Sequence, residues 1–220
     1  AAGMGHLDCV NVLLDARADI ESKTRQLLIR DSVPLIRTVA QGHLAVVKLL
    51  LNRTADANAA LGRACLTTKM TPLHLVAVRD RPDIARALVD AKADLEVRNS
   101  SCFFHHNCTP LMVAAFLGRP EVAAVLLDAG ADAEARTWSC CGVRAAHIAA
   151  FAGRGRVLQV LARFGADLDA KAFFCYTPFL VAMGCLRYPT ACKLSELGAF
   201  VPCPFRLCCR RRRMQEVKVA

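Results

Sequence analysis

The sequence predicts an all-α solenoid, in which helix–turn–helix units stack side by side and finger loops project between them. A block recurs five times along the chain, and its most regular copy is Thr71 to Asp94, TPLHLVAVRDRPDIARALVDAKAD. From the first residue of the block to its closing Ala is 22 positions in every full copy, whereas the connectors vary from 11 to 16 positions. Self-similarity at a period of about 33 residues indicates a solenoid. Packed helices tolerate no insertion and projecting loops do, so a constant block with variable connectors favours stacked helices.

Each block begins like a capped helix. Three copies open with Thr-Pro, at Thr71, Thr109 and Thr177. The threonine suits the N-cap, and the proline suits the first helical position, where its missing N–H costs nothing. A second helix follows in each copy, with apolar residues at helical spacing.

Several turns lack the residue that they would prefer. Where other copies have glycine, the turn between the two helices falls on Asp80 and Leu186, and the second helix ends at Arg17, Thr54 and Lys92. Glycine adopts positive φ more readily than any of these residues, so we expect weaker turns there.

The fingers should be irregular, with little true β-structure. A hairpin turn two residues before the next block needs a left-handed residue. That place holds, in chain order, Asp31, Lys69, Asn107, Gly142 and Cys175. Lys and Cys do not accept this conformation readily.

The block resembles the ankyrin repeat, through Thr71-Pro72-Leu73-His74 and the Ala93-Asp94 ending. The resemblance runs from Gly3 to about Leu207 and implies an ankyrin-repeat solenoid. It divides the chain into a partial N-terminal repeat with its finger (1–32), repeats at 33–70, 71–108, 109–143 and 144–176, a degenerate C-terminal repeat (177–207) and a basic tail (208–220). Because Ala1 falls inside a repeat, we expect the sequence to be a fragment of a longer protein.

Composition narrows the class of protein. The formal net charge is +10, and the last twenty residues carry six basic residues against Glu216, a net +5. The repeat body is therefore only mildly basic and does not favour a nucleic-acid surface. No run of about 18 uncharged apolar residues predicts a membrane span. The chain has 12 cysteines, which we expect to be mostly reduced thiols because the family that it resembles is typically intracellular.

Aromatic residues in the connectors are the first candidates for function. Projecting loops are usually polar, and exposed aromatics anchor protein interfaces. Alternatively, successive fingers pack on one another and bury these rings. The resemblance implies a partner-binding concave face of first helices and fingers, with these expected contacts: Arg98, Phe103, Phe104, His105, Arg136, Trp138, Lys171 and Phe174.

Histidines and cysteines suggest structural roles more than chemistry. The resemblance implies that His74 and His147 bond neighbouring loops. The segment Cys102–Cys108 holds four potential zinc ligands in seven residues, and the adjacent Cys140 and Cys141 could help. Structural zinc sites usually combine two separated ligand pairs, so we predict no metal and no cofactor.

The tail leaves alternatives open. Cys208 and Cys209 precede a basic run at Arg210–Arg213. The cysteines could be acylated beside anionic lipid, so that membrane contact would occur through the tail only. The run could instead direct nuclear import or touch RNA. We favour a solvated tail without either role.

No catalytic motif is present. The sequence contains no phosphate-binding loop, no His-Glu-x-x-His and no nucleophile elbow, so we expect neither an enzyme nor a small-molecule substrate. The resemblance implies an intracellular, cytoplasmic scaffold that binds an unidentified protein. Other hypotheses are a regulatory or substrate-docking array of a larger enzyme or channel, a membrane-peripheral adaptor anchored by the tail, and a degenerate sequence with no stable role.

Overall fold

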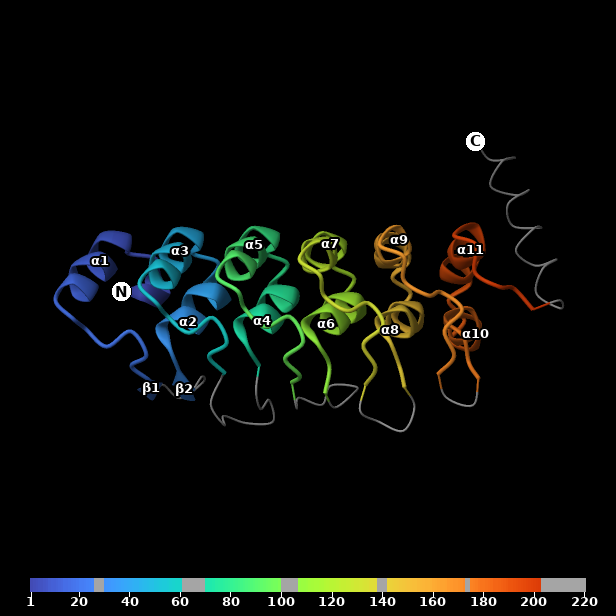
Figure 1. The fold of residues 1–220 in the computed structure, drawn as a ribbon, viewed down its shortest axis with the longest axis horizontal. Helices are drawn as coiled ribbons and strands as arrows, with labels where there is room; N and C mark the ends of the chain where they lie inside the picture. The colour runs from blue at the N-terminus through green and yellow to red at the C-terminus, as the bar shows by residue number, and fades with distance from the viewer. Residues whose placement is uncertain (26–29, 61–69, 100–106, 138–141, 173–174, 203–220) are drawn as a thin grey trace.

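The computed structural model describes residues 1–25, 30–60, 70–99, 107–137, 142–172 and 175–202. These residues form two rows of helices that run side by side along one axis, and the connectors extend from one of the rows, away from the other (Figure 1). We call the row next to the connectors the inner row and the other the outer row. The prediction of an all-α helical solenoid is confirmed.

The two rows alternate along the chain. The inner row consists of the 3-10 helix η1 (Ala2–Met4) and helices α2 (Pro34–Gln41), α4 (Pro72–Arg79), α6 (Pro110–Leu117), α8 (Ala145–Ala152) and α10 (Pro178–Gly184). The outer row consists of α1 (Leu7–Asp15), α3 (Leu44–Asn52), α5 (Pro82–Asp90), α7 (Pro120–Asp128), α9 (Gly155–Arg163) and α11 (Tyr188–Glu196).

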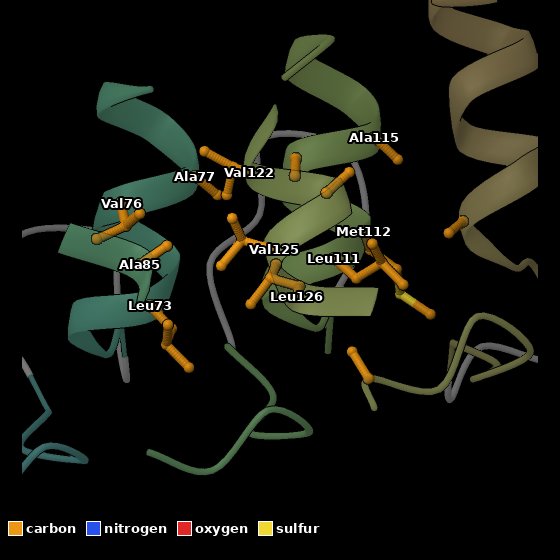
Figure 2. Packing of buried hydrophobic residues seen from close by; sticks show 14 of the residues in the cluster. Leu73, Val76, Ala77, Ala85, Leu111, Met112, Ala115, Val122, Val125 and Leu126 are labelled. Carbon is orange, nitrogen blue, oxygen red and sulfur yellow. The ribbon is translucent and has the colours of Figure 1, made fainter. Parts of the chain in front are cut away.

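The core is one continuous apolar layer between the rows. Figure 2 shows its middle, in which Leu73 and Val76 of α4, Leu111 of α6, and Val122 and Leu126 of α7 are among the packed side chains. Alanines fill much of the remaining space, and this lets neighbouring helices approach closely. Each repeat therefore buries its apolar faces against its neighbours, as expected of a solenoid.

Non-glycine residues adopt the left-handed conformation wherever the repeat demands it. Lys92 has φ of 59°, at the place where later copies have Gly130 and Gly165. The amide of the next residue, Ala93, donates to the Leu88 carbonyl oxygen at 3.0 Å, which closes a Schellman motif at the end of α5. The turns that were expected to be weak thus keep the repeat geometry, at a cost in backbone strain. Besides Lys92, the residues that adopt positive φ in these turns are Arg17, Thr54, Asp80 and Leu186.

Replacing Lys92 with glycine is expected to raise the free energy of unfolding by about 0.5–1 kcal/mol. Lys92 is exposed, so the change removes left-handed strain and no packing. Urea denaturation checks this. Lys92→Ala, which keeps the strain, should bring no gain, and equal gains in the two variants would contradict the explanation.

The fingers contain little β-structure in the described residues. A short pair joins β1 (Thr24–Arg25) to β2 (Arg30–Ser32), and single bridges join Asn99 to Cys108 and Ala172 to Tyr176. At the hairpin position, Asn107 and Cys175 have φ of 67° and 78°, so Cys175 adopts the conformation that its side chain disfavours. Asp31 instead lies in β2, and Lys69 lies outside the described residues.

A ladder of hydrogen bonds ties successive repeats together beyond the outer helices. The amide of Asp94 donates to the Asn58 side-chain oxygen at 2.8 Å, and the amide of Asp132 donates to a Glu96 carboxylate oxygen at 2.9 Å. The same bond recurs at Asp56, Asp167 and Phe200. The donor in each case is a backbone amide; the aspartate carboxylates instead accept from the amide two residues on, as Asp94 does from Glu96 at 2.9 Å.

Candidate protein-binding surface

The inner helices leave one side uncovered. Helix α6, for example, packs on α4 and α8 at its two flanks and on α7 behind it. The remaining side faces away from the outer row, so the exposed side chains of the inner helices lie on it. We call this surface the inner face.

Large apolar side chains gather on the inner face of the three central repeats. They stand at the seventh and eighth residues of the inner helices. Val78 of α4 is 38% exposed and Phe151 of α8 is 45% exposed, while Phe116 and Leu117 of α6 are half-buried. We call Val78, Phe116, Leu117 and Phe151 the apolar strip. Exposed apolar side chains aligned over consecutive elements are typical of a binding surface.

The strip is confined to the middle of the solenoid. The seventh residue is Ala40 in α2 and Gly184 in α10. The second and last inner helices therefore carry no large side chain at this position. Tyr176, which precedes α10, is 50% exposed but lies outside the inner helices. A partner that requires this strip would therefore contact the repeats from α4 to α8.

The candidate residues named from the sequence fall into two groups. Phe103, Phe104, His105, Trp138 and Phe174 lie outside the described residues. The other three are described: Arg98 is half-buried, and Arg136 and Lys171 are exposed.

Arg98 links two neighbouring fingers. Its Nη1 donates to the Arg136 carbonyl oxygen at 2.7 Å and to the Asn107 carbonyl oxygen at 3.3 Å. A charged donor bonded to two carbonyls is held in place. Arg98 therefore supports the finger backbone, and Arg136 and Lys171 remain the exposed basic side chains among the three.

His74 is a buried structural link between repeats. Its Nε2 lies 3.0 Å from the Cys108 carbonyl oxygen in the next finger, and its Nδ1 lies 2.8 Å from Thr71 Oγ1. A carbonyl oxygen only accepts, so Nε2 carries the hydrogen and Nδ1 accepts from Thr71. Burial lowers the pKa of His74 from 6.5 to about 4, so the ring is neutral at pH 7.

His147 repeats this arrangement one unit before the end of the solenoid. Its Nε2 lies 3.2 Å from the Tyr176 carbonyl oxygen, and its Nδ1 accepts from the Arg144 amide at 3.4 Å. Burial lowers its pKa as well. Arg144, which stands where other copies have threonine, pairs with Glu134 at 2.9 Å and with Asp167 at 3.4 Å. The structural role expected for both histidines agrees with these contacts.

The described residues offer no metal centre. They contain no group of three or more His, Cys, Asp or Glu side chains placed to hold an ion. Cys102, His105, His106, Cys140 and Cys141 lie outside them, and so does the tail with Cys208 and Cys209. Burial raises the pKa of the Cys108 thiol to about 11, so this cysteine is protonated at pH 7. Within the described parts of the chain, no helix is both long and apolar enough to cross a bilayer.

Comparison with known proteins agrees with this architecture. The family model described as "Ankyrin repeats (3 copies)" matches residues 1–99 and 35–137. The chain belongs to the ankyrin repeat family. It is also 33% identical over 99 residues to the Drosophila melanogaster protein "Ankyrin repeat and KH domain-containing protein mask". That match covers 45% of this chain and 2% of the relative's length.

Ankyrin repeats are in general protein–protein interaction modules, and the apolar strip is a candidate surface that the sequence alone did not single out. An alignment of the repeat copies contains the signal that could have identified this strip. The seventh residue of the first helix is Ala in the second repeat and Gly in the last, but Val78, Phe116 and Phe151 in the three between. A position that gains large apolar residues without becoming buried is a candidate contact.

Proposed function

We propose that this chain is a non-catalytic scaffold that binds a partner protein through the inner face and the adjoining fingers. The observation that carries the proposal is the apolar strip, which places Val78, Phe116 and Phe151 in line across three repeats. A few well-packed side chains near the centre of a protein interface, aromatic ones prominent among them, supply most of its binding energy. The exposed Arg136 and Lys171, and the finger residues Phe103, Phe104, His105, Trp138 and Phe174, would add contacts at the rim, and Arg98 would support the finger backbone that presents Arg136.

The cellular setting is part of the proposal. The cysteines that the structure describes form no disulfides, which supports a reducing, intracellular and cytoplasmic environment. The run at Arg210–Arg213 leaves nuclear entry as the alternative compartment. We propose no enzymatic activity, no cofactor and no nucleic-acid ligand for the array.

A second candidate is a docking or regulatory array within a larger enzyme or channel. The observation that favours it is the length of the Drosophila relative, of which the matching segment is only 2%. The inner face would then bind a substrate or another domain of the same protein. A full-length transcript that encodes a catalytic or membrane domain would distinguish this role from that of a free scaffold.

The double variant Val78→Ser and Phe151→Ser is expected to lose at least tenfold of the captured partner in proximity labelling. Both side chains are more than one third exposed, so the variant should stay folded, and two interface truncations of about 1 kcal/mol or more each account for the loss. Circular dichroism checks the fold first.

A matched control uses the outer row. Phe164, which follows α9, is 40% exposed, close to the value for Phe151. Phe164→Ser should leave capture unchanged. Equal loss of capture in the control would indicate non-specific binding through any exposed aromatic ring. Loss only in a Phe103→Ser, Phe104→Ser, Trp138→Ser variant would place the contact on the fingers alone.

A further inference from the structure

Positive charge accumulates at one end of the solenoid. Residues 144–200 contain seven basic and three acidic residues, a net +4, and residues 201–220 add +5. Nearly all of the chain's net charge of +10 therefore lies in residues 144–220. The repeats before them are close to neutral, although they share the same framework.

The excess results partly from one charge reversal on the outer row. The second residue of the outer helix is Asp83 in α5 and Glu121 in α7, but Arg156 in α9. The first turn of a helix favours a carboxylate, because the helix dipole is positive there. Arg156 opposes this preference, is exposed and stands in a first turn without acidic residues. Local stability does not explain this residue, which suggests a role in binding.

A strained leucine projects beside this helix. Leu186 forms the turn between α10 and α11, with φ of 57°, and is 69% exposed. The same turn uses Gly42, Gly118 and Gly153 in other repeats. A leucine there strains the backbone and gains almost no burial. The repeat imposes this strain on other residues too, but Leu186 is the one large apolar side chain among the described non-glycine residues with positive φ, and its exposure leaves it available for contact.

The apolar and basic side chains share one edge. The residues after Leu186 are Arg187 and Tyr188, and Tyr188 is 36% exposed. The Arg187 side chain crosses to the preceding repeat, since a Cβ placed on Gly153 would lie 3.1 Å from Arg187 Cδ. Arg187 therefore lies beside the turn that leads into Arg154 and Arg156. We call Arg154, Arg156, Leu186, Arg187 and Tyr188 the C-terminal edge.

The tail leaves the solenoid at the same end. The last described residue, Pro202, follows α11, as Figure 1 shows for the C-terminal part of the chain. The sequence beyond it carries four consecutive arginines, Arg210–Arg213. The sequence that follows α11 therefore adds positive charge to a chain whose last repeats are already basic.

We propose that the C-terminal edge binds the surface of a membrane rich in anionic lipid. Leu186 and Tyr188 enter the interfacial layer, and Arg156 and Arg187 contact the lipid phosphates. Arg154, whose Nε donates to the Phe116 carbonyl oxygen at 3.2 Å, ties the edge to the preceding repeat. Basic residues beside projecting apolar ones are the combination that holds a protein at an anionic bilayer. The projecting Leu186 suits a bilayer, which accepts protruding side chains, better than an acidic peptide, which would need a groove. This proposal is independent of the partner-binding role of the inner face.

The test is cosedimentation of the full chain with phosphatidylcholine vesicles, with and without phosphatidylserine, at about 0.1 M salt. Binding is expected only when phosphatidylserine is present. Arg156→Gln should weaken the vesicle partition coefficient about fivefold. Leu186→Asn should weaken it by a similar factor while raising the urea midpoint, because Asn accepts the left-handed conformation. If Leu186 had only a structural role, Leu186→Asn would not lower the partition coefficient while raising the urea midpoint.

The matched control is Arg86→Gln, the same change at an exposed outer position of α5. Its partition coefficient should stay within about twofold of wild type. A fall equal to that of Arg156→Gln would show that net charge alone matters and would overturn the proposal. So would wild-type binding by both edge variants, which would assign the contact to the tail. Binding to polyglutamate without binding to the vesicles would identify an acidic-protein site instead.

Discussion

Leu126→Ala is expected to lower the free energy of unfolding by about 2–5 kcal/mol, the range for truncation of a buried leucine. Leu126 is 1% exposed and lies on α7 in the middle of the stack, facing Leu111 of α6 (Figure 2). The substitution leaves a cavity that the neighbouring repeats cannot close, because α5 on one side and α9 on the other hold α7 in place. Urea denaturation followed by circular dichroism measures the change.

The chain supplies its own control for this prediction. Leu13 occupies the same position of the outer helix in α1, but it is 49% exposed because no described repeat covers that side. Leu13→Ala should therefore cost less than about 1 kcal/mol. If both variants lost the same stability, burial between repeats would not be what stabilises the array.

The comparison of these two leucines also shows what the sequence could predict. The block length and the Thr-Pro openings indicated the helices and their order, because helix caps and apolar periodicity are local properties. The register that places Leu126 and Leu13 at equivalent positions was visible as well. Their different exposure was not, since it depends on which neighbours are present in space.

The left-handed positions show a second limit of local reasoning. Lys92, Leu186 and Cys175 disfavour positive φ, so weaker turns were expected there, but all three adopt it. The stacked helices on both sides fix the path of the chain and override a local preference of about 1 kcal/mol. Asp31 shows the reverse, because it accepts a left-handed turn readily and lies instead in β2.

The candidate binding surface was predicted only in part. Aromatic residues in the connectors drew attention because loops are usually polar, and they suggested the fingers. The apolar strip lies on helices, where apolar residues are ordinarily buried. Val78 and Phe151 became candidates only when the structure showed that three sides of each inner helix are covered and the fourth is not.

Acidification from pH 7.5 to pH 4 is expected to cost the fold about 3 kcal/mol through His74 alone. The unfolded ring has a pKa near 6.5, and burial lowers the pKa in the folded chain to about 4. Between these values the unfolded state binds a proton that the folded state excludes, so stability falls as the pH falls. The stabilisation through His74 is fully present above about pH 6.5. Below about pH 4 the free energy of unfolding changes little further through this residue. His147, whose pKa burial also lowers, adds a loss of the same sign.

The control is His74→Met, a residue that the next repeat already holds at the matching position, where Met112 is 1% exposed. At neutral pH the variant should lose about 1–3 kcal/mol, because the Cys108 carbonyl oxygen loses its donor. Carboxylates titrate in both proteins, so the quantity to compare is the difference between their urea-derived stabilities at each pH. That difference should shrink by about 3 kcal/mol from pH 7.5 to pH 4, and could change sign. A difference that stays constant would mean that His74 is protonated without penalty in the folded chain, and that its bond to the next finger is not the neutral link described above.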